Sequence, residues 1–199
     1  MIFNSLTIPI FPEAVLHICK LNVDKNIILN YINCVNFEKT NGGTNSFMSS
    51  NKYVLNDLDI LKNEIQKHVK NYLLNLMQYE MNFKFVKSWI TKTEPKGYSS
   101  QHLHSNSFLS GVYYPEASKD FNIIFYKKKN FWSILCKNYN DLNALNYKLN
   151  ILEDNFLILF PSNLEHKVDF NSSSNNRYSI AFNINPSGYI GSGDSHIFF

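Results

Sequence analysis

The sequence predicts a mainly β fold, a sandwich or barrel, with helices supplied by its N-terminal part. From Phe83 onward, short aromatic and β-branched segments alternate with turn residues. Most of these segments have no helix of useful length between them, which disfavours a βαβ arrangement. The 199 residues are 44% hydrophobic, enough for one domain with a real core. We therefore expect a single domain over residues 1–199.

The first 80 residues are predicted to be a mixed, largely helical support. Residues 24–35 carry apolar side chains at helical spacing, and residues 41–46 have the composition of a loop. A stronger helix follows, capped by Asn56 or Asp57 and ending near residue 77. We expect it to cover a sheet. Its apolar face comprises Leu58, Leu61, Ile65, Val69, Tyr72, Leu73 and Leu76.

The remaining residues, 83–199, are predicted to form the β core. Strands are expected near residues 83–89, 108–114, 121–126, 156–160 and 178–184. A longer polar and aromatic insert, about residues 127–149, interrupts the series. An insert of this kind at the end of a barrel can serve as a lid over its mouth.

Charge and cysteine content exclude several classes of protein. The net charge of +3 is too small to indicate nucleic-acid binding. No apolar run is long enough to span a membrane, and the first residues lack the basic start of a signal peptide. Cys19, Cys34 and Cys136 include no CxxC pair, so we expect a reducing cytoplasm rather than a disulfide framework. A homodimer through the helix at 57–77 stays open.

Three histidines form the first candidate site. His102 and His104 are two residues apart, and in extended backbone such side chains point to the same face. His166 follows the apolar strand at 156–160. The three imidazoles could reach one metal ion. His17, His68 and His196 have no partner pattern, and we expect them to be structural.

The single arginine of the chain forms the second candidate site. Of 19 basic residues, 18 are lysine, so Arg177 stands out. Arginine binds a carboxylate through two parallel hydrogen bonds, which lysine cannot do. Ser179 shares the face of Arg177 by the alternation of a strand. Together, the Arg177 guanidinium and the Ser179 hydroxyl predict a binding site for a carboxylate.

The combined pattern resembles the iron(II)- and 2-oxoglutarate-dependent oxygenases. More narrowly, it is similar to a group of short oxygenases of this kind found in marine bacteria and their phages. The resemblance runs from about Trp89 to the C-terminus. The matching words are Trp89 with Lys96-Gly97, His102-Leu103-His104-Ser105-Asn106-Ser107, Leu109-Ser110-Gly111-Val112-Tyr113-Tyr114, Phe160-Pro161-Ser162 with His166, and Arg177-Tyr178-Ser179-Ile180-Ala181-Phe182-Asn183.

The resemblance implies a double-stranded β-helix, a jelly-roll, covered by the N-terminal helices. It implies that His102, His104 and His166 hold Fe(II), and that Arg177 and Ser179 bind the far carboxylate of 2-oxoglutarate. Either Tyr113 or Tyr114 should face inward. We assign Tyr114 to the 2-oxoglutarate site.

One residue departs from the wider family, which has a carboxylate where His104 stands. Iron(II) accepts imidazole readily, so an all-histidine site is chemically reasonable. Two alternatives remain at this point. Either His104 is a ligand, or it lies outside the ligand set and a displaced ligand such as Asn106 or water completes the site.

The activity implied is that of a dioxygenase. It would use O2 to oxidise 2-oxoglutarate to succinate and couple this reaction to hydroxylation of an unidentified substrate. A cupin-like metalloenzyme without 2-oxoglutarate and a non-catalytic jelly-roll binding module are alternatives, as is a zinc hydrolase. The cupin-like enzyme and the zinc hydrolase give Arg177 and Ser179 no function. The binding module would leave the histidines as a coincidence or as ligands of a structural metal.

Overall fold

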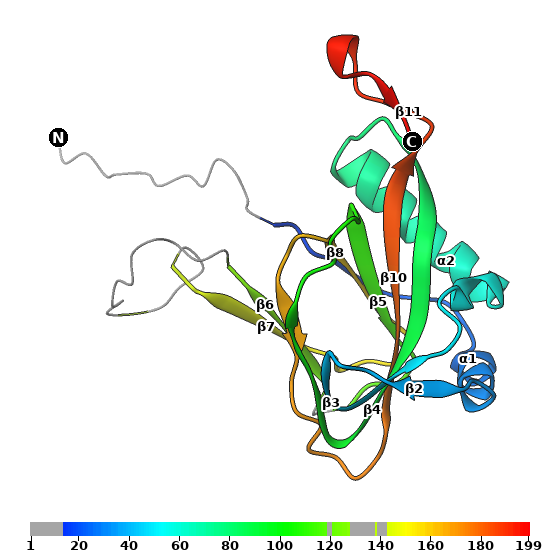
Figure 1. Ribbon diagram of the computed structural model, residues 1–199, viewed down its shortest axis with the longest axis vertical. Coiled ribbons are helices and arrows are strands. Elements are labelled where there is room, and N and C mark those ends of the chain that lie inside the picture. The colour runs from blue at the N-terminus through cyan, green and yellow to red at the C-terminus, as the bar shows by residue number, and fades with distance from the viewer. Residues whose placement is uncertain (1–13, 119–120, 128–137, 139–142) are drawn as a thin grey trace.

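The computed structural model describes residues 14–118, 121–127, 138 and 143–199. Ten strands form one curled antiparallel sheet, in the order β1-β8-β5-β10-β4-β9-β6-β7, with β3 joined to β4 and β2 to β3 (Figure 1). The sheet is a jelly-roll, as expected. Its strands are β1 His17–Lys20, β2 Phe37–Lys39, β3 Gly43–Ser49, β4 Asn82–His102, β5 Leu109–Tyr114, β6 Asn122–Tyr126, β7 Asn146–Asn150, β8 Phe156–Pro161, β9 His166–Val168 and β10 Arg177–Ser187.

Strand β4 connects the two sides of the roll. Its first half pairs with β10, while its second half pairs with β3 and β9. Between them the backbone bends at Lys96, which has a φ of 64°. At Gly97 a Cβ atom would lie 2.6 Å from the carbonyl oxygen of Asn45, so only glycine fits this close approach. The bend carries the end of β4, and with it His102, to the side where β9 lies.

Helices cover the outer face of the larger part of the sheet, as Figure 1 shows. They are α1 Lys25–Asn33 and α2 Asp59–Lys70, and α2 continues into a π-helical segment, Asn71–Leu76. Their buried side chains share one core with outward-facing residues of β5, β8 and β10. Those on the helical segments are Ile28, Ile32, Leu61, Ile65, Val69, Tyr72 and Leu73.

A second core fills the inside of the roll. Its buried residues come from strands on both sides and from the connections between them. They are Trp89, Val112, Tyr114, Phe121, Ile123, Phe125, Ile151, Ile158, Phe160 and Ala181. Strand β5 lies between the two cores, so all six of its residues are buried.

The structure corrects three expectations about element boundaries. Residues 43–46 belong to strand β3 rather than to a loop, because they pair with residues of β4. Helix α2 begins at Asp59, because a 3-10 turn occupies Val54–Asn56. The insert near 127–149 ends in a strand, β7, which pairs with β6 in a hairpin that extends away from the roll (Figure 1). The predicted lid itself lies outside the described residues.

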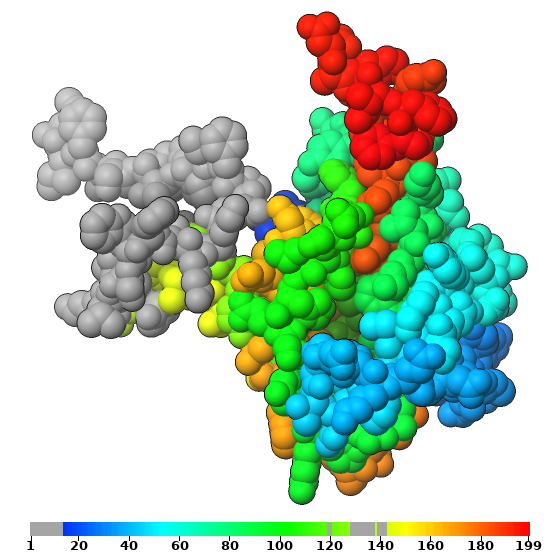
Figure 2. Space-filling view, in the orientation of Figure 1, coloured from blue at the N-terminus to red at the C-terminus, as the bar shows by residue number. Residues whose placement is uncertain are grey.

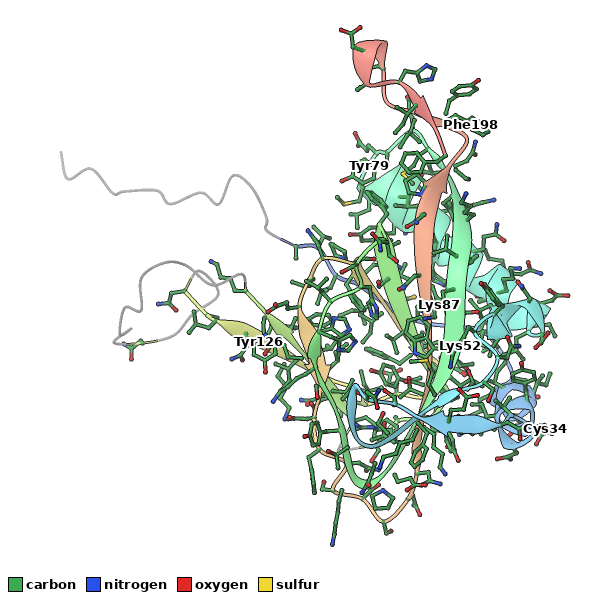
Figure 3. All side chains as sticks on the ribbon, in the orientation of Figure 1. Cys34, Lys52, Tyr79, Lys87, Tyr126 and Phe198 are labelled. Atoms are coloured by element: carbon green, nitrogen blue, oxygen red, sulfur yellow. The ribbon has the colours of Figure 1, made fainter. Side chains whose placement is uncertain are left out.

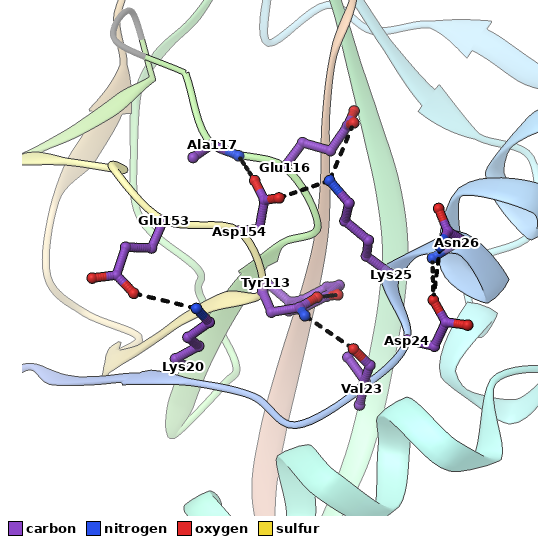
Figure 4. Close-up of polar contacts among 11 residues, drawn as sticks. Lys20, Val23, Asp24, Lys25, Asn26, Tyr113, Glu116, Ala117, Glu153 and Asp154 are labelled. Atoms are coloured by element: carbon purple, nitrogen blue, oxygen red, sulfur yellow. Dashed lines mark hydrogen bonds and ion pairs between the residues drawn. The ribbon is translucent and has the colours of Figure 1, made fainter.

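A polar cluster ties α1 to the turn before β8 (Figure 4). The Asp154 carboxylate accepts hydrogen bonds from Lys25 Nζ at 2.7 Å and from the Ala117 main-chain N–H at 2.8 Å. The Tyr113 hydroxyl donates to Asn155 Oδ1 at 2.6 Å. Tyr113 therefore points out of the roll, toward the helical side.

The chain ends in a small hairpin of β11 Tyr189–Ile190 and β12 Ile197–Phe198, which projects from the main body (Figure 2). The His196 ring stacks on Tyr189 with centroids 4.9 Å apart. None of the described helices has the length and hydropathy that crossing a membrane would require.

Candidate active site

Three histidines converge at the junction of β4 and β9. His102 ends β4 and His166 begins β9, and the two are directly paired across the strands. Their ring centroids are 4.4 Å apart, and the His104 ring lies 5.1 Å from each. One nitrogen from each ring can be chosen so that all three lie within 4.8 Å of one another. The structure thus brings together the three residues that the sequence singled out as metal ligands.

Hydrogen bonds to the backbone orient two of these rings. His102 Nδ1 donates to the Ser100 carbonyl oxygen at 2.7 Å, and His166 Nδ1 donates to the Leu164 carbonyl oxygen at 3.0 Å. A carbonyl oxygen can only accept, so Nδ1 carries the proton and Nε2 keeps a lone pair. This is the usual arrangement of a metal-binding histidine. His104 is held through its main-chain N–H, which donates to the Ser162 carbonyl oxygen at 3.0 Å.

The surroundings keep His104 and His166 neutral at ordinary pH. Burial, followed by the neighbouring His102, lowers the pKa of His166 to about 3. Burial, then His102 and Lys87, lowers the pKa of His104 to about 4. Neutral imidazole is the form that binds a metal ion. The site can therefore accept a cation without first losing protons from these rings.

Aromatic side chains surround the histidines. Phe160 and Phe125 lie against the His166 ring, at centroid distances of 4.8 Å and 6.0 Å. Trp89 meets the His104 ring edge-on at 5.6 Å. The ammonium group of Lys87, labelled in Figure 3, lies 5.4 Å from the Trp89 ring centroid. These rings restrict the movement of the imidazoles and limit the access of water.

A buried cation lies on the inner face of β10. Arg177 is only 2% exposed. Its guanidinium donates to the Asp169 carbonyl oxygen at 2.8 Å, and its Cζ lies 5.2 Å from the Phe121 ring centroid. Ser179 follows two residues later on the same face, opposite Thr91 of β4, and is half-buried. A carboxylate is the natural partner for a guanidinium in such a place.

The Tyr114 hydroxyl adds an independent indication of a ligand. Tyr114 belongs to the inner core, and its hydroxyl has no hydrogen-bond partner among the residues that the structure describes. Burial raises the pKa of Tyr114 to about 12, an effect that the positive charge of Arg177 partly opposes. The hydroxyl is therefore a neutral donor near a guanidinium. Buried polar groups are normally satisfied, so this one fits a bound acceptor such as a carboxylate.

Sequence reasoning missed several residues that shape the site. One of them is Phe121, whose ring contacts the Arg177 guanidinium and which the sequence predicts only as part of a strand. Inside the roll, Ser110 Oγ donates to Asn183 Oδ1 at 2.9 Å and lies 2.8 Å from Ser162 Oγ. These hydrogen bonds hold Ser162, whose carbonyl oxygen accepts the hydrogen bond from the His104 main-chain N–H. Ser110, Ser162 and Asn183 lie within the motifs that carry the resemblance, but nothing in the sequence assigns them a function, and only the pairing of their strands relates them. Asn106 has a φ of 61°, in the left-handed region of the backbone.

The family comparison agrees with this geometry. Residues 87–183, about half of the chain, match the family model described as "Putative 2OG-Fe(II) oxygenase". The matched segment contains the three histidines, Tyr114, Arg177 and Ser179. A search of curated protein sequences gave no match.

Solved structures share the fold at low sequence identity. HygX from Streptomyces hygroscopicus, with nickel, 2-oxoglutarate and hygromycin B bound, has a TM-score of 0.62 at 8% identity, over 86% of this chain and 82% of that one. The prolyl hydroxylase of Trichoplax adhaerens, in complex with a hypoxia inducible factor peptide, has a TM-score of 0.60 at 13% identity, over 85% and 82%. The epimerase SnoN from nogalamycin biosynthesis gives 0.58 at 9%, over 85% and 77%.

The fold and the family match define an oxidoreductase of the jelly-roll class. The chain belongs to the 2OG-Fe(II) oxygenase family, whose cofactors are Fe(II), 2-oxoglutarate and O2.

Proposed function

We propose that this protein is a dioxygenase that hydroxylates an unidentified substrate and couples this reaction to oxidative decarboxylation of 2-oxoglutarate to succinate. One observation carries the proposal. A cluster of three imidazoles and a buried donor pair, Arg177 with Tyr114, adjoin the same inner core of the roll. The first suits a divalent metal, and the second suits the far end of a dicarboxylate.

The residues divide the task between them. His102, His104 and His166 would hold Fe(II), which when bound supplies the activation of O2. Arg177 would bind the far carboxylate of 2-oxoglutarate, with hydrogen bonds from Ser179 and Tyr114. These contacts would fix the orientation of the cosubstrate before reaction. Because an imidazole ligand brings no negative charge, the bound cation would keep its full charge, which favours an anionic cosubstrate.

The aromatic side chains around the histidines would keep water out of the site. Phe125, Phe160 and Trp89 leave little polar surface beside the histidines. An oxidation site gains from this, because water can quench reactive species before they meet the substrate. Substrate would approach from the side where His102 is exposed.

A turnover assay tests the proposal. Purified protein is incubated with Fe(II), ascorbate, O2 and 2-oxoglutarate, and succinate is measured. These oxygenases are expected to release some succinate even without their substrate. We expect succinate from the wild type and from Lys39→Ala, a change on exposed strand β2, and a large loss from His166→Ala and Arg177→Ala. Equal activity in Arg177→Ala would contradict the assigned cosubstrate site.

The alternatives predict other outcomes of the same assay. A cupin-like metalloenzyme or a zinc hydrolase would bind metal and form no succinate. A non-catalytic binding module would do neither. Tyr114 and Arg177 favour the oxygenase, because a buried unpartnered hydroxyl beside a guanidinium has no use in these alternatives.

We also propose a cytoplasmic location. Cys19 and Cys34 are free thiols in the described part of the chain. Free thiols are typical of reducing compartments. The single domain and the homodimer expected from the sequence stay predictions, which light scattering and limited proteolysis can test.

A further inference from the structure

A second group of metal-binding side chains lies on the outer side of the sheet, where β1 meets α2. His17 and Cys19 alternate along β1, so their side chains share a face. His68 comes from the last turn of α2. One ligand atom from each, two ring nitrogens and the Cys19 sulfur, lie within 4.8 Å of one another. We propose that these residues bind a divalent cation of the zinc type.

The contacts within this group are already those of a compact site. His17 Nε2 lies 3.5 Å from His68 Nδ1, and the two ring centroids are 5.7 Å apart. All three residues are half-buried. A small rotation of each side chain would bring nitrogen and sulfur to the roughly 2.0–2.3 Å that zinc requires.

The donor types select the metal. Two imidazoles and a thiolate suit Zn²⁺, which also accepts one carboxylate, whereas Mg²⁺ and Ca²⁺ prefer sites built from oxygen ligands alone. Burial and the charge of Glu64 raise the pKa of the Cys19 thiol to about 12, so a bound cation must displace its proton.

Glu64 can supply a fourth ligand. It lies four residues before His68 on α2, on the same side of the helix. Its side chain is 16% exposed and its carboxylate now pairs with Lys67 Nζ at 2.6 Å. Glu64 helps to raise the pKa of Cys19, and His68 helps to lower the pKa of Glu64, which places Glu64 beside the group. Exchange of Lys67 for a cation would complete four-coordination.

The position of the site indicates a structural role. Strand β1 is at the edge of the sheet and pairs with β8 alone among the described strands. Its outer face meets α2 through the His17 ring, which also lies 6.4 Å from that of Tyr72. The Tyr72 hydroxyl donates to the Val15 carbonyl oxygen at 3.1 Å. A cation here would fasten the edge strand to the helix that covers the sheet.

Titration with Co²⁺, a spectroscopic substitute for Zn²⁺, tests the proposal. A thiolate bound to Co²⁺ gives a charge-transfer band in the near ultraviolet. Co²⁺ bound to the three histidines of the active site cannot give this band, because histidine has no sulfur. The band therefore reports this site separately. We expect it within two equivalents in the wild type, which has both sites, and within one equivalent in His166→Ala. We expect Zn²⁺ to abolish it and to raise the melting temperature.

Substitutions of the proposed ligands, compared with one at another cysteine, provide the control for the Co²⁺ titration. Cys19→Ser and His68→Ala should weaken or remove the band, while Cys34→Ser, a change at an exposed thiol, should keep it. Absence of the band in the wild type would overturn the proposal, as would its persistence in Cys19→Ser. Neither result bears on the oxygenase assay, so the two proposals fail independently.

Discussion

His102 and His166 face each other across the pairing of β4 with β9, with their ring centroids 4.4 Å apart. The register of two strands therefore positions two of the three imidazoles. Each ring is also aligned by its own Nδ1 hydrogen bond to a carbonyl oxygen two residues earlier. His104 lies beyond the end of β4 and is positioned by the connection to β5 instead.

This difference predicts unequal effects of substitution on metal binding. His166→Ala should lower the affinity for Fe(II) or Co²⁺ by at least about a hundredfold, because it removes an aligned ligand from a preformed site. His104→Asp should retain binding, because it supplies the carboxylate that the wider family has at this position. Calorimetry with Co²⁺ in a Cys19→Ser background, where the second proposed site is lost, measures both, with His104→Ala for comparison. A His104→Asp variant that binds no metal would contradict the geometry assigned to His104.

Arg177→Ala should weaken 2-oxoglutarate binding while leaving metal affinity nearly unchanged. Loss of hydrogen bonds between charged groups costs about 1.5–3 kcal/mol, roughly a tenfold to 150-fold loss of affinity. Arg177→Lys should recover only part of it, because lysine cannot bind a carboxylate through two parallel bonds. The measurement is 2-oxoglutarate affinity of the metal-loaded protein. An equal loss of metal binding would instead indicate a damaged fold.

Tyr114→Phe should have opposite effects on stability and on cosubstrate binding. It removes a buried hydroxyl that lacks a partner, so the protein without cosubstrate should gain about 1 kcal/mol in free energy of unfolding. The same change should weaken 2-oxoglutarate binding by about fivefold, since a donor is lost. Thermal unfolding with and without 2-oxoglutarate tests both effects. Tyr113→Phe, on the outer face, should lose stability and leave 2-oxoglutarate binding unaltered.

Gly111→Ala should destabilise the fold by about 1–3 kcal/mol. A Cβ atom at this position in β5 would lie 2.2 Å from Cζ of Phe182 and 2.8 Å from Cδ2 of Leu159. Both side chains are buried, so neither has room to move. Gly42→Ala is the control, because its nearest neighbour would be the Thr40 hydroxyl at 3.3 Å. Urea unfolding compares the two, and equal midpoints would show that the core adapts.

The sequence predicts the strands and the main helix because their patterns are local. Period-two and helical spacing mark β5, β8, β10 and α2, and these elements form near the expected residues. The residues at 43–46 were expected to form a loop, because their composition gives no sign of a strand. They are extended because β4 pairs with them, a long-range contact with no local pattern.

The candidate sites likewise contain residues that the local sequence identifies and residues that only the packing of the fold brings together. His102, His104, His166 and Arg177 could be selected because their residue types are rare or closely spaced. His17 and His68 show no partner pattern in the sequence and are predicted to be structural, yet His17 Nε2 lies 3.5 Å from His68 Nδ1. They are 51 residues apart in the chain, and only the packing of α2 on β1 brings them together. The inward position of Tyr114 follows from the direction of β5, which the sequence leaves undetermined.

The most direct test of the central claim is an anaerobic titration of the metal-free protein with Fe(II) and then 2-oxoglutarate, followed by visible absorbance. Two-point binding of 2-oxoglutarate to Fe(II) gives a weak metal-to-ligand charge-transfer band. We predict this band in the wild type, its absence in His166→Ala, and a need for much more 2-oxoglutarate in Arg177→Ala. Iron binding without any band, at saturating 2-oxoglutarate, would contradict the assigned site.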